Sequence, residues 1–256
     1  MGSYSRENQL ASAAACTSFK ATMYINEALK CKNTVLLDKR MLIRDFETGE
    51  IRIKELTALM IACIMGNIKT VQQIVTEARK RMTKEDFNLF INVKVERNQG
   101  GNNALLYACS SSSANYMLVN YLVKYANADC NLPNDFTRNS LLIATRKNQI
   151  NVVELLLQKN VDINFNDANG CNALHIACTQ GYTQTVEILL NQWAVKKRQD
   201  PDHCFDIDVM DNLSLTSLMK ASINNHLEIV KLLLCFGANP RIVTMNGESS
   251  LTLACM

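Results

Sequence analysis

Proline and glycine are scarce in this chain of 256 residues, which contains 3 prolines and 9 glycines. Together with a hydrophobic fraction of 48%, this scarcity excludes a disordered, low-complexity chain and favours a helix-rich folded protein. No run approaches the roughly 18 apolar residues that a membrane span needs, so no membrane partner is expected. The net charge of +3 is too small to indicate nucleic acid as a partner.

Signals for secretion and catalysis are also missing. No basic region followed by an apolar core opens the chain, so the 10 cysteines are expected in a reducing environment rather than in disulfides. A cytoplasmic location is predicted, and a nuclear one stays open. Gly-rich phosphate loops, nucleophile elbows and HExxH motifs do not occur. We therefore expect no enzymatic activity, no cofactor and no small-molecule substrate.

What the chain does contain is a repeated hexapeptide. Its copies are "TALMIA" from Thr57, "NALLYA" from Asn103, "NSLLIA" from Asn139, "NALHIA" from Asn172, "TSLMKA" from Thr216 and "SSLTLA" from Ser249. The closing alanines, at positions 62, 108, 144, 177, 221 and 254, are separated by 46, 36, 33, 44 and 33 residues. These intervals predict a repeat of constant length that carries insertions.

A second pattern follows four of the six hexapeptides at a constant distance. Four residues after the alanine stand residues that adopt a left-handed conformation at low cost, namely Gly66, Asn148, Gly181 and Asn225. Nine residues after it stand Val71, Val153, Val186 and Val230, each followed by an apolar pair. Apolar residues at i, i+3 and i+4 indicate one face of a helix. Each unit is thus predicted to be a short helix, a tight turn, a longer helix and an extended loop.

This pattern resembles the ankyrin repeat, D-x-x-G-x-T-P-L-H-x-A followed by V-x-x-L-L, over about residues 36–256. The resemblance implies an all-α solenoid of stacked helix-turn-helix units with β-hairpin-like fingers. Residues 35–256 would form the array, with about five repeats and a truncated sixth, and residues 1–34 a helical cap or degenerate repeat. No hexapeptide keeps the proline and only His175 keeps the histidine, so the array is diverged.

Cys171, His175 and Cys178 invite a metal-site interpretation. However, His175 stands at the position of the family's structural histidine. Cys178 follows the repeat alanine, as Cys63, Cys109 and Cys255 do elsewhere, where cysteine serves as a small apolar residue. Because zinc needs four converging ligands, or three and water, we favour the structural interpretation and expect no metal.

Insertions near residues 79–99 and 191–209 interrupt the period. In the first, Thr83 and Asp86 have the spacing of a helix cap, and "INVKVE" suggests an extended finger. The second is expected to lengthen the loop after the fourth repeat, where Trp193 would cover the core rather than contact a ligand. "RKR" at 79–81 and "KKR" at 196–198 follow second helices, which favours helix-end charges over a binding patch.

Three further expectations concern local structure. Residues 41–54 alternate around a Thr-Gly turn and are predicted to form a hairpin, the first finger. "SSSS" at 110–113 predicts an inserted residue, because the apolar positions Leu118, Tyr121 and Leu122 come one residue late. The chain stops within the first helix of a sixth repeat, which should leave apolar surface bare, and this suggests a shortened chain or a partner packed there.

The resemblance implies a non-enzymatic scaffold that binds another protein on the concave face of the array. By register, the first-helix contact positions are Ile64, Met65, Arg146, Lys147, Thr179, Gln180, Ile223 and Asn224. The finger positions are Asp135, Phe136, Arg138, Ala168, Asn169, Cys171, Asn212, Leu213 and Leu215. The alternatives are a regulatory or targeting domain of a larger enzyme or channel, and a structural subunit of a large assembly.

Overall fold

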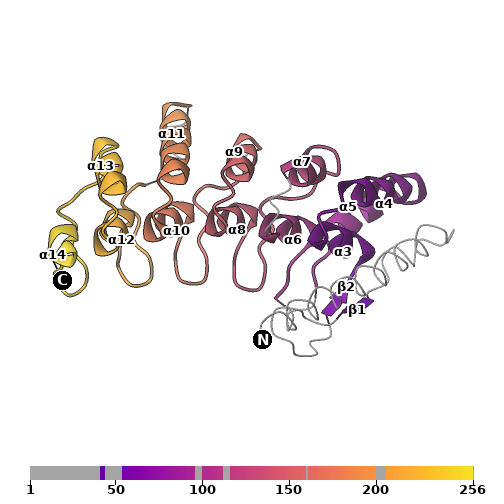
Figure 1. The fold of residues 1–256 in the computed structure, drawn as a ribbon, viewed down its shortest axis with the longest axis horizontal. Coiled ribbons are helices and arrows are strands. Elements are labelled where there is room, and N and C mark those ends of the chain that lie inside the picture. The colour runs from indigo at the N-terminus through magenta and orange to yellow at the C-terminus, as the bar shows by residue number, and fades with distance from the viewer. Residues whose placement is uncertain are drawn as a thin grey trace, which may run out of the picture. The chain divides into compact units, whose positions relative to one another are not determined.

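The structure, a computed structural model, describes residues 41–43, 54–95, 100–111, 116–159, 161–199 and 206–255. The predicted N-terminal cap, residues 1–34, lies outside the described residues. The chain divides into two compact units, Met1–Asp129 and Cys130–Met256, called unit 1 and unit 2 below. In both units the described secondary structure is mainly helical, as expected for an all-α repeat protein (Figure 1).

The first described elements of unit 1 are two paired strands at the ends of the predicted hairpin, whose connecting residues 44–53 lie outside the described residues. Strand β1 (Met41–Ile43) pairs antiparallel with β2 (Lys54–Leu56), and Met41 lies opposite Leu56. Two helix pairs follow, α3 (Ala58–Ile64) with α4 (Ile68–Arg81), and α6 (Ala104–Ser110) with α7 (Tyr116–Lys124). The first helices α3 and α6 contact each other, and so do the second helices α4 and α7. This is the stacking predicted for consecutive repeats.

The inserted segments of unit 1 follow the predictions only in part. Thr83 caps an extra helix, α5 (Lys84–Asn92), by accepting the N–H of Asp86. The prediction that "INVKVE" is extended throughout is wrong, because its first two residues end α5. The late register of the second repeat is confirmed, since Met117 is 60% exposed and Leu118 is 0% exposed. Ser112 and Ser113 lie outside the described residues.

The described residues of unit 2 form three helix pairs and one further first helix. The pairs are α8 (Ser140–Arg146) with α9 (Ile150–Gln158), α10 (Ala173–Gln180) with α11 (Thr183–Gln199), and α12 (Ser217–Ile223) with α13 (Leu227–Cys235), followed by α14 (Ser250–Ala254). The first helices α8, α10, α12 and α14 contact one another in sequence, as do α9, α11 and α13. Figure 1 shows these two rows, with the loops extending beyond the first helices.

Helix caps and turns explain why the hexapeptide starts each first helix. Its leading residue is the N-cap, and its side-chain oxygen accepts the N–H three residues later, at Thr57, Asn103, Asn139, Asn172, Thr216 and Ser249. The predicted left-handed turn residues are confirmed at Gly66 (φ 66°), Asn148 (51°), Gly181 (74°) and Asn225 (56°). Because these caps and turns involve residues only a few positions apart, the local sequence determines where the first helices begin and where the turns fall.

The core lies between the helices of each pair and its neighbours. The hexapeptide leucines Leu174 and Leu218 are 1% and 2% exposed, as predicted. The closing alanines Ala62, Ala108, Ala144, Ala177 and Ala221 are fully buried. An alanine at this position lets neighbouring helices approach closely.

The second insertion differs from the prediction of a lengthened loop, since residues 191–199 continue α11 to Gln199. The reason is local: this stretch contains neither glycine nor proline before Pro201 and is rich in good helix formers. Trp193 is 7% exposed on this extension, and the Lys197 ammonium lies 4.8 Å from its ring centroid. "KKR" and "RKR" therefore occupy the last turns of α11 and α4, which agrees with helix-end charges.

Candidate protein-binding surface

The loops before the first helices of unit 2 form four similar fingers, residues 134–139, 167–172, 211–216 and 244–249. In each finger the first residue is buried, and its side-chain oxygen accepts the backbone N–H groups two and four residues later. These residues are Asn134, Asp167, Asp211 and Thr244. The fourth residue takes a left-handed conformation, at Thr137 (φ 50°), Gly170 (73°), Ser214 (58°) and Gly247 (78°). The finger backbone is therefore held by its own side chains.

Sequence reasoning missed this device, although a signal was present. The accepting residue stands five positions before the N-cap in every copy, for example Asp167 before Asn172 and Asp211 before Thr216. A search for short polar residues at that spacing would have found it.

The carboxylates of the two aspartates that open fingers, Asp167 and Asp211, are buried and each has a cationic partner. Asp167 Oδ2 lies 3.0 Å from Arg146 Nη2, and the Asp167 side chain is 1% exposed. Asp211 Oδ2 lies 2.7 Å from Lys220 Nζ, and the Asp211 side chain is 2% exposed. Burial acts to raise the pKa of Asp211, but Lys220 and the N–H groups of Leu215 and Leu213 outweigh it and lower the pKa. Asp211 therefore anchors its finger as an anion, and the Asp167 carboxylate anchors its finger through the ion pair with Arg146.

Large apolar side chains are exposed on and beside these fingers. We call Phe136, Leu213, Ile223, Arg138 and Lys147 the finger surface. Phe136 is 55% exposed, Leu213 is 74% exposed and Ile223 is 46% exposed. The Arg138 guanidinium carbon lies 5.3 Å from the Phe136 ring centroid, and Lys147 is exposed. Exposed aliphatic and aromatic groups on a rigid backbone are material for a protein interface.

The other candidate residues of unit 2 fall into two classes. The first class consists of exposed polar or small residues, namely Asp135, Ala168, Asn169, Gln180, Asn212 and Asn224. The second class is half-buried and consists of Cys171, Thr179 and Leu215. Thr179 Oγ1 donates to the His175 carbonyl within its own helix. Arg146 is exposed but its guanidinium is engaged by Asp167. Lys147 is the candidate cation of that helix end.

Ile64 and Met65 belong to unit 1, at the end of α3. They are 43% and 38% exposed, so this turn also presents apolar side chains.

The Cys171, His175 and Cys178 group has structural roles. Asn172 and His175 form a capping box, and His175 Nε2 lies 3.2 Å from the carbonyl oxygen of Leu215 in the next finger. Burial, followed by the nearby Lys220 ammonium, lowers the pKa of His175, so the neutral ring donates to that carbonyl. Cys178 is fully buried, which raises the pKa of its thiol. Among the described residues, no three potential metal-ligating side chains of His, Cys, Asp or Glu cluster.

A second surface lies on unit 1, around Phe87. A cavity of about 590 Å³ is lined by the first half of α5 and the two residues before it, together with Arg79 and Asn127. The Arg79 guanidinium carbon lies 5.1 Å from the Phe87 ring centroid, and Arg79 also donates to the carbonyl of Tyr125. Phe87 is therefore half-covered by its own unit, and it offers less apolar area than Phe136.

No helix within the described part of the chain combines the length and the apolar character of a membrane span. The charged side chains of α11, the longest helix in that part, agree with this finding.

Comparison with known proteins places the repeats in a family. A profile of three ankyrin repeats matches residues 28–134 and 112–203, and a single-repeat profile matches residues 215–245. The Ankyrin repeat and KH domain-containing protein mask-1 of Caenorhabditis elegans is 28% identical over 185 residues, 72% of this chain and 6% of that protein. BCL-6 corepressor-like protein 1 of Homo sapiens is 32% identical over 112 residues, 43% of this chain and 6% of that protein.

NF-kappa-B inhibitor alpha of Sus scrofa is 32% identical over 118 residues, which cover 46% of this chain and 36% of that protein. The chain thus spans only a minor part of the length of each of these relatives. The family profiles, in contrast, cover most of this chain and coincide with its helix pairs. The chain therefore belongs to the ankyrin-repeat family.

Proposed function

We propose that this chain is a non-enzymatic interaction module that binds another protein through the finger surface of unit 2. The observation that carries the proposal is the exposure of Phe136 and Leu213 on fingers whose backbone is already fixed, with Ile223 exposed at the end of α12. Binding to a rigid surface requires little ordering of the module, so more of the contact energy contributes to affinity.

The chemistry of the surface indicates the kind of partner segment. Phe136 and Leu213 offer apolar contact, whereas Arg138 and Lys147 supply positive charge beside it. Asp167 is neutralised by Arg146, so it does not cancel that charge at the surface. We therefore expect a partner segment with an apolar anchor and an acidic flank.

The family and the names of two relatives support a protein as the partner. NF-kappa-B inhibitor alpha is named for an action on another protein, and BCL-6 corepressor-like protein 1 is named in the same way. We propose a protein ligand for this chain by analogy, and a cytoplasmic or nuclear setting for the interaction.

The test compares matched variants against a captured partner. Phe136→Ala should weaken binding by about 2 kcal/mol, roughly 30-fold in Kd, as truncation of an interface hot spot does. Leu89→Ala, at a residue that is 72% exposed on α5, is the control and should leave Kd unchanged. Lys147→Glu should act mainly on the association rate and its salt dependence. Titration calorimetry and stopped-flow kinetics measure both effects.

A rival site would give a different result. If deletion of residues 199–205 abolishes binding while Phe136→Ala leaves it intact, the partner binds near the end of α11 and the finger-surface proposal is lost. If purified partner binds both Phe136→Ala and Lys147→Glu as it binds the wild type, the proposal is equally lost.

A further inference from the structure

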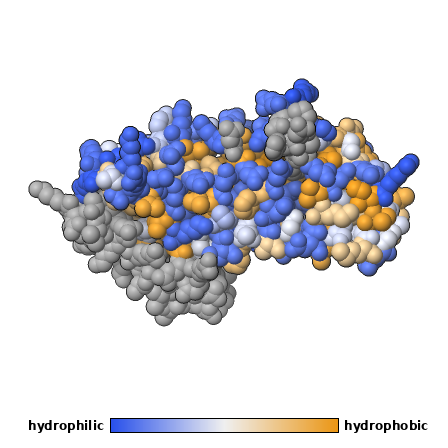
Figure 2. Space-filling view, turned by 180° about the vertical axis from the view of Figure 1, so that it is seen from behind, coloured by the Kyte–Doolittle hydropathy of each residue, from blue (hydrophilic) through white to orange (hydrophobic). Residues whose placement is uncertain are grey.

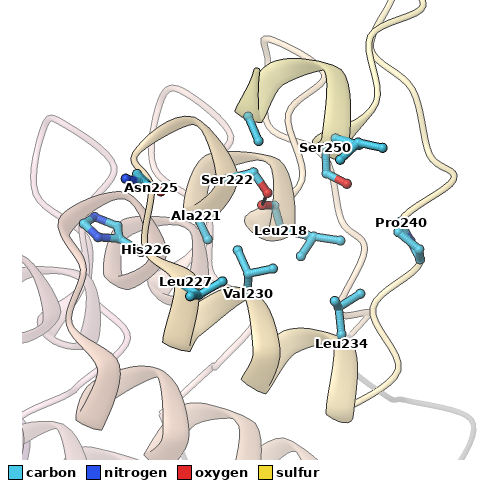
Figure 3. A pocket seen from close by; sticks show the side chains of 12 residues that line it. Leu218, Ala221, Ser222, Asn225, His226, Leu227, Val230, Leu234, Pro240 and Ser250 are labelled. Atoms are coloured by element: carbon cyan, nitrogen blue, oxygen red, sulfur yellow. Dashed lines mark hydrogen bonds between the residues drawn. The ribbon is translucent and has the colours of Figure 1, made fainter. Parts of the chain in front are cut away.

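Unit 2 has one large apolar cavity, of about 350 Å³, between α12, α13 and α14. Figure 3 shows the side chains of Leu218, Val230 and Leu234 pointing into it, and Figure 2 shows apolar side chains gathered at this end of unit 2, at the right of the view. Among the described residues its lining contains no Asp, Glu, Lys or Arg, so it offers no charge that would select an occupant. The fingers, in contrast, contain groups that can react with each other.

Two of the four fingers carry an asparagine that is followed by a glycine. The pairs are Asn169–Gly170 in finger 167–172 and Asn246–Gly247 in finger 244–249, and no other Asn-Gly pair occurs in the sequence. Both asparagines are exposed, so water reaches their side chains. Because glycine has no side chain, it leaves its own backbone nitrogen unhindered. That nitrogen is a nucleophile next to the asparagine amide.

We propose that Asn246 is a site of spontaneous deamidation in the folded chain, whereas the finger of Asn169 protects it from the same reaction. The backbone nitrogen of Gly247 attacks the side-chain Cγ of Asn246, ammonia leaves with the proton of that nitrogen, and a succinimide ring forms. Water then opens the ring at one of its carbonyl carbons and leaves aspartate or isoaspartate. The net reaction consumes one water molecule and releases one ammonia molecule, so it needs neither an enzyme nor an oxidant.

The attack requires the finger to open, because the glycine N–H is occupied in the closed turn. Gly170 N–H donates to the Asp167 carbonyl and Gly247 N–H donates to the Thr244 carbonyl, both at 2.9 Å. The nitrogen attacks only after it has lost its proton, so the N–H must first leave this hydrogen bond. The rate at each site therefore depends on how often its finger opens locally.

The two fingers differ in the side chain that holds them closed. In finger 167–172 the Asp167 carboxylate accepts two backbone N–H groups at 2.9 and 3.0 Å. In finger 244–249 the Thr244 hydroxyl accepts the equivalent two groups at 3.3 and 3.2 Å. Hydrogen bonds to a carboxylate are shorter and stronger than bonds to a neutral oxygen. Finger 244–249 therefore opens more readily than finger 167–172.

A second contact holds finger 167–172 closed. Asn212 of the next finger donates its backbone N–H to the Asn169 carbonyl and its Nδ2 to the Ala168 carbonyl, both at 3.0 Å. A Cβ atom added at Gly170 would lie 2.6 Å from Asn212 Oδ1, so Asn212 also covers the reactive pair. Opening this finger breaks these two bonds in addition to its own.

The position of Asn246 gives the reaction a consequence for the surface of the molecule. Asn246 is the third residue of its finger, which is the place that Phe136 and Leu213 occupy in theirs. Deamidation therefore adds a negative charge to the row of finger positions that presents these apolar side chains. The reaction itself does not rest on the proposed function, because it needs no partner.

The test follows both asparagines in one sample. The folded full chain is incubated at neutral pH, and mass spectrometry of its proteolytic peptides measures the conversion of amide to carboxylate at each site. Asn246 should react at least about tenfold faster than Asn169, because finger 167–172 must break two further hydrogen bonds to open. In urea the two rates should agree within about threefold, because the unfolded chain keeps the Asn-Gly pairs but not the finger contacts.

Matched variants identify the contacts that control the rate. Asn212→Ala should speed the reaction at Asn169 at least about fivefold and leave the rate at Asn246 unchanged. Thr244→Asp should slow the reaction at Asn246 at least about threefold, because a carboxylate then closes that finger. Asn246→Gln is the control for the assay and should abolish conversion at that position, because the longer side chain closes a ring far more slowly.

Three results would overturn the inference. The first is equal rates at the two sites in the folded chain, and the second is conversion of neither site. The third is an unchanged rate at Asn169 in Asn212→Ala, which would show that the contact between the fingers does not protect it. Circular dichroism of each variant verifies that it is folded.

Discussion

Leu174→Ala would remove a fully buried side chain from the centre of unit 2. Leu174 is 1% exposed on α10, so the loss of its burial costs about 1.5–3 kcal/mol, and the remaining cavity raises the cost to roughly 2–5 kcal/mol. Leu251 occupies the same hexapeptide position but is 74% exposed. Leu251→Ala should therefore cost less than about 1 kcal/mol.

The single tryptophan makes this difference measurable in the relevant repeat. Trp193 is buried on α11, which packs against α10, so its fluorescence during urea titration reports unfolding around Leu174. The midpoint should fall markedly for Leu174→Ala and little for Leu251→Ala, with the slope m unchanged. A loss well under 1 kcal/mol for Leu174→Ala, or equal losses for both, would refute the assigned register.

Three other outcomes follow from the contacts in unit 2. Arg146→Glu should lower the free energy of unfolding by about 1–3 kcal/mol, because it leaves the buried Asp167 without its cation, whereas Lys147→Glu should change it by less than about 0.5 kcal/mol in the same titration. The lowered pKa of His175 means that the unfolded chain takes up a proton that the folded chain does not. The contribution of neutral His175 to the free energy of unfolding should thus be fully present above about pH 6.5 and should decrease as the pH falls below that value. In thermal melts between pH 7.5 and 5.5, His175→Gln should abolish this decrease. EDTA and a thiol reductant should leave the melting temperature and helicity unchanged, and a stoichiometric zinc ion found by elemental analysis would contradict this.

Local chemistry explains why much of the helical pattern was predictable. A short polar residue such as Asn172 caps the helix that follows it, and Gly181 ends that helix in a left-handed conformation. These interactions span only a few residues, so the sequence determines them directly. The shift from Met117 to Leu118 was predictable for the same reason, because helical periodicity depends on neighbouring positions alone.

The misassigned segments had a different cause. The family period places a loop at residues 191–199, yet their intrinsic helix propensity extends α11 to Gln199. Likewise, "INVKVE" alternates, but its first residues complete the last turn of α5. In both places helix propensity outweighs the family period or a short alternation.

The sequence by itself determined the family, the helix pairs and the residues that each finger presents. Only the tertiary structure decided which contacts these residues make. Asp167 and Asp211 occupy the same finger position, yet one pairs with Arg146 of the preceding repeat and the other with Lys220 of its own repeat. Leu174 and Leu251 occupy the same hexapeptide position, yet one is buried and the other exposed. The physical reason is that ion pairing and burial depend on which neighbouring element lies within a few ångströms, and a repeated local pattern does not specify that neighbour.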